Sequence, residues 1–106
     1  MKFNFMRMMV MFDLPMTSYE DKKHYQTFRK HLLSHGFIME QESIYTKLIT
    51  DPRKVKKETE TLKTLCPFYG MIEVLMVTEN EYRKIEYLTG KPDDTYLKST
   101  EELVIL

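Results

Sequence analysis

A chain of 106 residues, 42% hydrophobic and 30% charged, has the size and composition of one globular domain rather than of a disordered protein. No apolar run approaches the ~18 residues of a membrane span, and the N-terminus lacks a signal-like apolar segment. The single cysteine, Cys66, excludes an internal disulfide. We therefore expect a cytoplasmic protein without membrane association, in which Cys66 is a small core residue.

The formal net charge is zero, but the two signs are unevenly spread along the chain. Residues 1–63 hold 12 Lys and Arg against 8 Asp and Glu, whereas residues 64–106 hold 4 against 8. A neutral total therefore does not exclude a polyanionic partner. It places any basic surface in the first half of the chain.

The most apolar stretch is 6–13, which predicts a strand ended by Pro15. Side chains alternate across a strand, so one face carries Met8, Val10 and Phe12, while the other carries Met9 and Met11 between Arg7 and Asp13. Because both faces are largely apolar, this is expected to be a central strand. Asp13, at its carboxyl end, is either a cap for the following turn or a functional group.

A helix over 18–35 is predicted next. Thr17 and Glu20 have the spacing of a capping box, and Gly36 is placed to end the helix. Its inner stripe consists of residues at helical spacing, namely Tyr25, Phe28, Leu32 and His35.

Residues 37–49 are predicted to form the second strand, with a bend or bulge at 40–42. A second helix begins at Asp51, with Pro52 in its first position, and continues to Pro67. Its inner face is supplied by Val55, Leu62 and Leu65.

Residues 70–78 form a third predicted strand, and Thr78 with Glu81 forms a capping box for a short helical turn. A fourth strand is predicted at 85–88. Residues 91–100 are expected to be a polar linker, and the apolar residues 103–106 a terminal strand.

This order is close to the α+β, ferredoxin-like βαββαβ arrangement. We expect a ferredoxin-like domain at 1–90 and, at 91–106, a linker with a strand exchanged in a dimer. Two helices cover only one face of such a sheet, although the other face carries Met9 and Met11. A second copy related by a twofold axis is the simplest cover, and the terminal strand could add to the partner's sheet.

The first helix carries two basic rows, because residues seven positions apart return to nearly the same angle. Lys22 lies in line with Arg29, and Lys23 with Lys30. The second helix adds a further basic run beginning at Arg53 and Lys54. These rows are either a nucleic-acid interface or ordinary solvated faces.

Three histidines, His24, His31 and His35, fall near one face of the first helix. The spacing of His31 and His35 can hold a transition metal. A partly buried, hydrogen-bonded pair is the interpretation that we favour.

Three motifs together resemble the Cas-two family of small CRISPR-associated proteins of spacer acquisition. The first strand ends Met11-Phe12-Asp13-Leu14-Pro15, the first helix ends with residues 29–37, and Gln41-Glu42-Ser43-Ile44-Tyr45 resembles the family's Gln-x-Ser-aliphatic-aromatic signature. The form of the first motif and the join at 36–39 are most similar to members from type II systems.

The resemblance implies a homodimer whose sheets stack face to face, with each C-terminal strand extending the partner's sheet. It also implies an adaptor that bridges two integrase dimers along protospacer DNA. Contacts would go to phosphates, which position a duplex without reading its sequence. The main candidates are Lys22, Lys23, Arg29 and Lys30, and weaker ones are Arg7, Lys47, Arg53 and Lys54.

The alternative implied by the resemblance is an Mg²⁺- or Mn²⁺-dependent endonuclease, acting on RNA or double-stranded DNA, with paired Asp13 residues as catalytic metal ligands. Arginines often found after that aspartate are replaced here by Met16 and Thr17, followed by Lys22 and Lys23. Lys cannot reproduce the bidentate contact of Arg with a phosphate. The adaptor role is therefore the favoured hypothesis.

Overall fold

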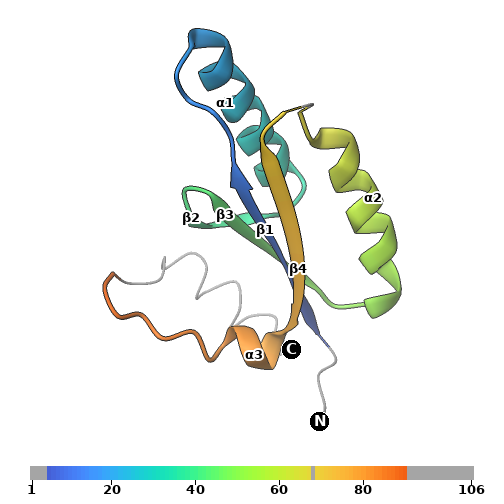
Figure 1. The fold of residues 1–106 in the computed structure, drawn as a ribbon. Coiled ribbons are helices and arrows are strands. Elements are labelled where there is room, and N and C mark those ends of the chain that lie inside the picture. The colour runs from blue at the N-terminus through green and yellow to red at the C-terminus, as the bar shows by residue number, and fades with distance from the viewer. Residues whose placement is uncertain (1–4, 68, 91–106) are drawn as a thin grey trace.

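The computed structural model describes residues 5–67 and 69–90 as an antiparallel sheet with two long helices (Figure 1). The elements in chain order are β1 (Met6–Asp13), α1 (Tyr19–Ser34), β2 (Ile38–Gln41), β3 (Ile44–Ile49), η1 (Pro52–Lys54), α2 (Val55–Leu65), β4 (Met71–Thr78) and α3 (Glu79–Tyr82). None of the described helices is long and apolar enough to cross a membrane.

The strands lie in the order β2-β3-β1-β4, and every pairing is antiparallel. With α1 following β1 and α2 following β3, this is the ferredoxin-like α+β fold that the sequence predicts. β1 is central, as expected from its two apolar faces.

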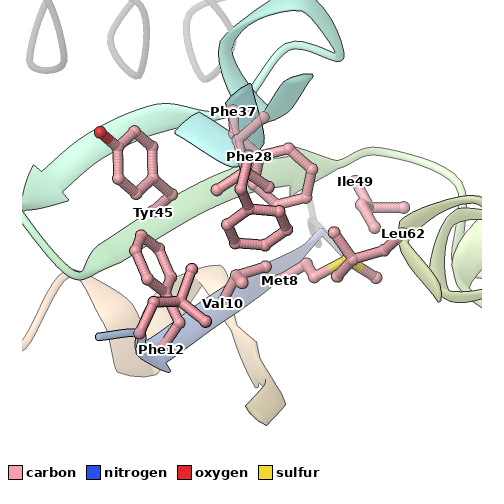
Figure 2. Close-up of a cluster of buried hydrophobic side chains, with 10 residues drawn as sticks. Met8, Val10, Phe12, Phe28, Phe37, Tyr45, Ile49 and Leu62 are labelled. Atoms are coloured by element: carbon pink, nitrogen blue, oxygen red, sulfur yellow. The ribbon is translucent and has the colours of Figure 1, made fainter. Parts of the chain in front are cut away.

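The core lies between the sheet and the helices (Figure 2). Met8 and Val10 are completely buried on β1, and they pack with Phe28 and Leu32 of α1 and Leu62 of α2. The predicted inner faces of the strand and of both helices are therefore confirmed at these positions. Burial of these apolar side chains stabilises the packing of the two helices on the sheet, because intrinsic helix propensity alone does not stabilise helices of this length.

Phe12 is the aromatic centre of this core. Its ring lies edge-on to Phe28 at 5.1 Å between centroids, stacks on Tyr45 at 5.7 Å and is tilted against Tyr25 at 5.8 Å. Aromatic pairs favour these offset and edge-on geometries. The last apolar residue of β1 thus fixes α1 and β3 next to Asp13.

The N-terminal cap of α1 is one residue later than predicted. Ser18, rather than Thr17, accepts from the backbone N–H of Asp21, and the Asp21 carboxylate accepts from the Ser18 N–H. These hydrogen bonds hold the pKa of Asp21 below its usual range. Thr17 contributes by donating its hydroxyl to the same carboxylate. The second predicted box, Thr78 with Glu81, is confirmed.

The predicted single strand at 37–49 is wrong, because the chain reverses inside it. β2 and β3 form a hairpin around Glu42 and Ser43, with a register irregularity between Met39 and Gln41. This irregularity corresponds to the bend or bulge expected at 40–42, whereas the reversal itself is made by Glu42 and Ser43.

The strand predicted at 85–88 is also wrong. After α3, residues 83–90 form no strand and do not pair with the sheet. Residues 85–90 line a cavity of about 540 Å³ together with Met9 of β1 and Ile44 of β3. The predicted linker at 91–100 and the terminal strand at 103–106 lie outside the described residues.

The sheet has a second surface, called here the open face, on the side away from α1 and α2. It consists of the side chains of Arg7, Met9, Met11 and Asp13 on β1 and of their register partners on β4, Val77, Leu75, Glu73 and Met71. Met71 is 61% exposed and Leu75 is 50% exposed.

Candidate nucleic-acid interface and the Asp13 edge

The basic rows predicted on the first helix lie on α1, which is 16 residues long and spans about 24 Å. Lys22, Lys23 and Lys30 are exposed, and none of them forms an ion pair within residues 5–67 and 69–90. The helix can bring these ammonium groups to a polyanion without first breaking an internal contact.

Arg29 differs from the other three cations of α1 because it is only partly exposed. Its guanidinium lies close enough to the Tyr45 hydroxyl to lower that group's pKa, although burial is the larger effect and raises it overall. Tyr45 has no exposed surface, and its hydroxyl has no hydrogen-bond partner of good geometry. Arg29 is therefore partly exposed on the surface of α1 and also interacts with Tyr45 of β3.

The weaker candidates are engaged within the protein. Arg7 is 2% exposed and donates to Glu79 from Nε at 2.9 Å and from a terminal nitrogen at 2.8 Å. Lys47 donates to Glu58 at 2.9 Å, and Arg53 pairs with Asp51 at 3.0 Å. Lys54 is exposed at the end of η1. These positions do not extend the rows of α1 into one basic surface.

Asp13 is exposed at the carboxyl end of β1, opposite Met71 in the register. Two contacts fix the backbone there. The Phe12 N–H donates to the Ser43 carbonyl at 3.0 Å, and Gly70, with a φ of +84°, lies against the chain at Asp13 and Leu14. Asp13 does not cap α1, because Ser18 does so.

A Cβ at Gly70 would stand 2.9 Å from the Asp13 carbonyl oxygen and 2.5 Å from Leu14 Cδ2. Glycine is thus required there both by the backbone conformation and by the close approach. The carboxylate projects from a rigid backbone at the end of the central strand.

No group of three or more His, Cys, Asp or Glu side chains able to hold a metal ion occurs in the part of the chain that the structure describes. His35 Nδ1 lies 2.8 Å from the His31 carbonyl oxygen, and His24 is hydrogen-bonded with the Tyr69 hydroxyl. All three histidines are exposed, so the expected partly buried pair of His31 and His35 is wrong, as is the expected place of His35 on the inner face of the helix. Cys66 is half-buried, and burial raises the pKa of its thiol.

A polar network on the open face was not predicted. Glu40 of β2 accepts hydrogen bonds from the hydroxyls of Tyr82 and, at 3.0 Å, Tyr87. The Arg7 guanidinium lies over the Tyr82 ring, 4.5 Å from its centroid. Burial raises the pKa of the Glu40 carboxyl, in spite of the hydrogen bond from Tyr87 and the positive charge of Arg7, which both lower it. Glu40 lies in the polar run 40–42, and that run gives no sign of partners more than 40 residues away in the chain.

The sheet order, the two helices on one face and the basic rows of α1 define a small ferredoxin-like α+β protein with a candidate polyanion-binding helix. Comparison with known proteins makes the assignment specific. Residues 6–85 match the family model described as "CRISPR associated protein Cas2". The chain belongs to the CRISPR-associated Cas2 family.

Curated relatives agree over nearly the whole length. The chain is 40% identical to a protein of Treponema denticola over 95% of this chain and 100% of the relative. It is 42% identical to one of Streptococcus mutans serotype c, over 95% and 93% respectively, and 34% identical to one of Ligilactobacillus salivarius, over 95% and 100%. All three relatives are named "CRISPR-associated endoribonuclease Cas2".

Proposed function

We propose that this protein acts in CRISPR spacer acquisition as a homodimeric adaptor that positions double-stranded protospacer DNA between integrase dimers. The observation that carries the proposal is the row arrangement of exposed Lys22, Lys23 and Lys30 on α1. Contacts from such a helix to phosphates hold a duplex in place without reading its sequence, which suits DNA of arbitrary origin.

The open face supports the dimeric part of the proposal. Met71 and Leu75 are both at least half exposed there, next to the half-buried Met9 and Met11. Apolar side chains grouped on one face of a sheet are stabilised when a second copy covers them. The terminal strand expected at 103–106 would add to the partner's sheet in this arrangement.

The test combines the protein with its cognate integrase and protospacer DNA. Complex mass and integration are measured for the unchanged protein, for Asp13→Asn and for Lys23→Glu combined with Lys30→Glu. We expect Asp13→Asn to integrate near normally and the charge reversal to fail. Loss of integration in Asp13→Asn, with the complex intact, would contradict a purely architectural role.

The second candidate function is a metal-dependent endonuclease, and the names of the relatives favour it. Asp13, exposed at the end of the central strand, is the candidate ligand. Mg²⁺ is commonly held by one or two carboxylates together with water and substrate oxygens. A twofold pair of Asp13 residues would supply two carboxylates to one ion. A bound Mg²⁺ or Mn²⁺ would lower the pKa of a water and stabilise the leaving oxygen.

Cleavage of single-stranded RNA and of double-stranded DNA, each with and without Mg²⁺ or Mn²⁺, tests this candidate. The nuclease requires cleavage that depends on metal and is lost in Asp13→Asn but kept in Glu60→Gln, a control on the exposed surface of α2. Cleavage that survives Asp13→Asn would rule out Asp13 as its source.

A further inference from the structure

The side of α1 that faces away from the sheet carries four exposed side chains in one line. They are called here the outer stripe, and they are Tyr19, Lys23, Gln26 and Lys30. Because successive residues of a helix are turned by about 100°, all four fall within about 60° of one another. The buried residues of the same helix, Phe28 and Leu32, lie on the opposite side and pack into the core. The outer stripe therefore points directly into the solvent.

Two members of the outer stripe are neutral hydrogen-bonding groups. Tyr19 is 81% exposed, and neither its hydroxyl nor the Gln26 amide is hydrogen-bonded to the part of the chain that the structure describes. The Thr27 hydroxyl, in contrast, donates to the Lys23 carbonyl at 2.9 Å and is satisfied within the helix. Phenol and carboxamide groups are among those that contact the phosphate and sugar oxygens of DNA. Both neutral members of the stripe are thus available to such a partner.

The acidic residues of α1 lie off the outer stripe. The helix has only two, Glu20 and Asp21, which are turned from Tyr19 by about 100° and about 200°. The Asp21 carboxylate is also engaged by the N-terminal cap of the helix. No carboxylate therefore interrupts the line of donors from Tyr19 to Lys30. This line is about 16 Å long, which is comparable to about five base pairs of duplex rise.

Neutral and cationic residues alternate along the outer stripe, and salt affects their contacts differently. An ammonium group that contacts a phosphate releases condensed counterions, so its contribution to affinity falls as salt is added. A neutral donor releases no counterion, and its contribution does not depend on salt in this way. Contacts from Tyr19 and Gln26 would therefore keep part of the affinity at salt concentrations that weaken the lysine contacts.

We propose that Tyr19 and Gln26 are DNA-positioning residues, which donate hydrogen bonds to phosphate or sugar oxygens of the duplex that Lys23 and Lys30 hold. The inference rests on the proposed DNA-binding role and deepens it, because it adds two uncharged contacts to a basic row. Phosphate and sugar oxygens are the same at every base pair, so these contacts hold the duplex without reading its sequence.

The test measures the affinity of the full chain for a blunt DNA duplex by fluorescence anisotropy at several salt concentrations. Tyr19→Phe combined with Gln26→Met removes both neutral donors and keeps side chains of similar size. Since one neutral hydrogen bond contributes a factor of about two to ten, we expect an affinity loss of about tenfold at every salt concentration. The slope of log affinity against log salt concentration should stay unchanged. Lys23→Ala, in contrast, should reduce that slope by about 0.9.

Thr27→Val is the matched control. It removes a hydroxyl of the same helix that lies off the outer stripe and is already bonded to the Lys23 carbonyl, so DNA affinity should not change. Tyr19→Phe alone alters one exposed hydroxyl and cannot disturb the core. It should show part of the same loss, about threefold, again with an unchanged slope.

Full affinity in Tyr19→Phe with Gln26→Met, while Lys23→Ala still weakens binding, would overturn the inference and leave the DNA-binding role standing. A loss accompanied by a smaller salt slope would mean that the two side chains act through the neighbouring lysines, which also contradicts it. An equal loss in Thr27→Val would attribute the effect to any change on α1 and count against it in the same way. If the unchanged protein bound no duplex at any salt concentration, both the inference and the proposed role would fail.

Discussion

Arg7 and Glu79 form a bidentate ion pair across the base of the open face, although 72 residues separate them in the chain. The two side chains are only 3% and 6% exposed. Glu79 also opens α3, and its backbone N–H donates to the Phe5 carbonyl at 3.0 Å. The pair thus fixes α3, and with it the start of the segment that crosses the sheet.

Glu79→Ala should lower the free energy of unfolding by about 3–5 kcal/mol, because it removes the carboxylate that balances the charge of a buried guanidinium. Combining Arg7→Met with Glu79→Leu removes both charges and should be much less destabilising than Glu79→Ala alone. Urea unfolding measures both. A double variant at least as unstable as Glu79→Ala would show that the uncompensated charge is not the cause.

Gly70→Ala should destabilise the protein more than Gly90→Ala. Both glycines have a positive φ, at +84° and +89°, so both substitutions carry the backbone penalty of about 1–2 kcal/mol. Only Gly70 lies against neighbouring atoms, whereas nothing stands within 4 Å of a Cβ at Gly90. The difference between the two variants, measured by thermal or urea unfolding, is the cost of pushing the chain away from Asp13 and Leu14. Equal losses would mean that this close approach is not constraining.

Glu40→Gln should change how stability depends on pH. Burial raises the pKa of Glu40 in the folded state above its unfolded value. The contribution of such a group is fully present below the unfolded pKa, near 4.3, and is lost as pH rises through the folded pKa. The stability of the unchanged protein relative to Glu40→Gln should therefore be greater at pH 4 than at pH 7. Urea unfolding at several pH values tests this, and a difference that grows toward neutral pH would contradict it.

Lys23→Ala combined with Lys30→Ala should weaken the binding of blunt duplex DNA and make it less sensitive to salt. Each phosphate contact contributes about 0.9 to the slope of log affinity against log salt concentration, so loss of two contacts should reduce the slope by about 2. Lys56→Ala combined with Lys57→Ala on α2 removes the same charge elsewhere and is the matched control. An equal reduction in both double variants would indicate a general charge effect rather than an interface on α1.

The sequence alone determined the features that depend on local patterns. Alternation along 6–13 identified the central strand and its core face, and helical spacing identified Phe28, Leu32 and Leu62 as buried. Cap residues located both ends of α1 to within a residue, whereas the second helix, predicted to start at Pro52, begins with the 3₁₀ turn η1 and becomes α-helical only at Val55. The signature ending in Tyr45 led to the family, and the comparisons agree.

Only the tertiary structure decided what depends on the register of the sheet. It paired Arg7 with Glu79, brought Glu40 to Tyr82 and Tyr87, and turned residues 37–49 into a hairpin. Such contacts join residues tens of positions apart, and a shift of one residue in register would turn each strand side chain to the opposite face. The pattern of apolar and polar residues within one strand does not specify which residues of the neighbouring strand it pairs with. The register is set when the apolar faces of strands and helices pack into one core.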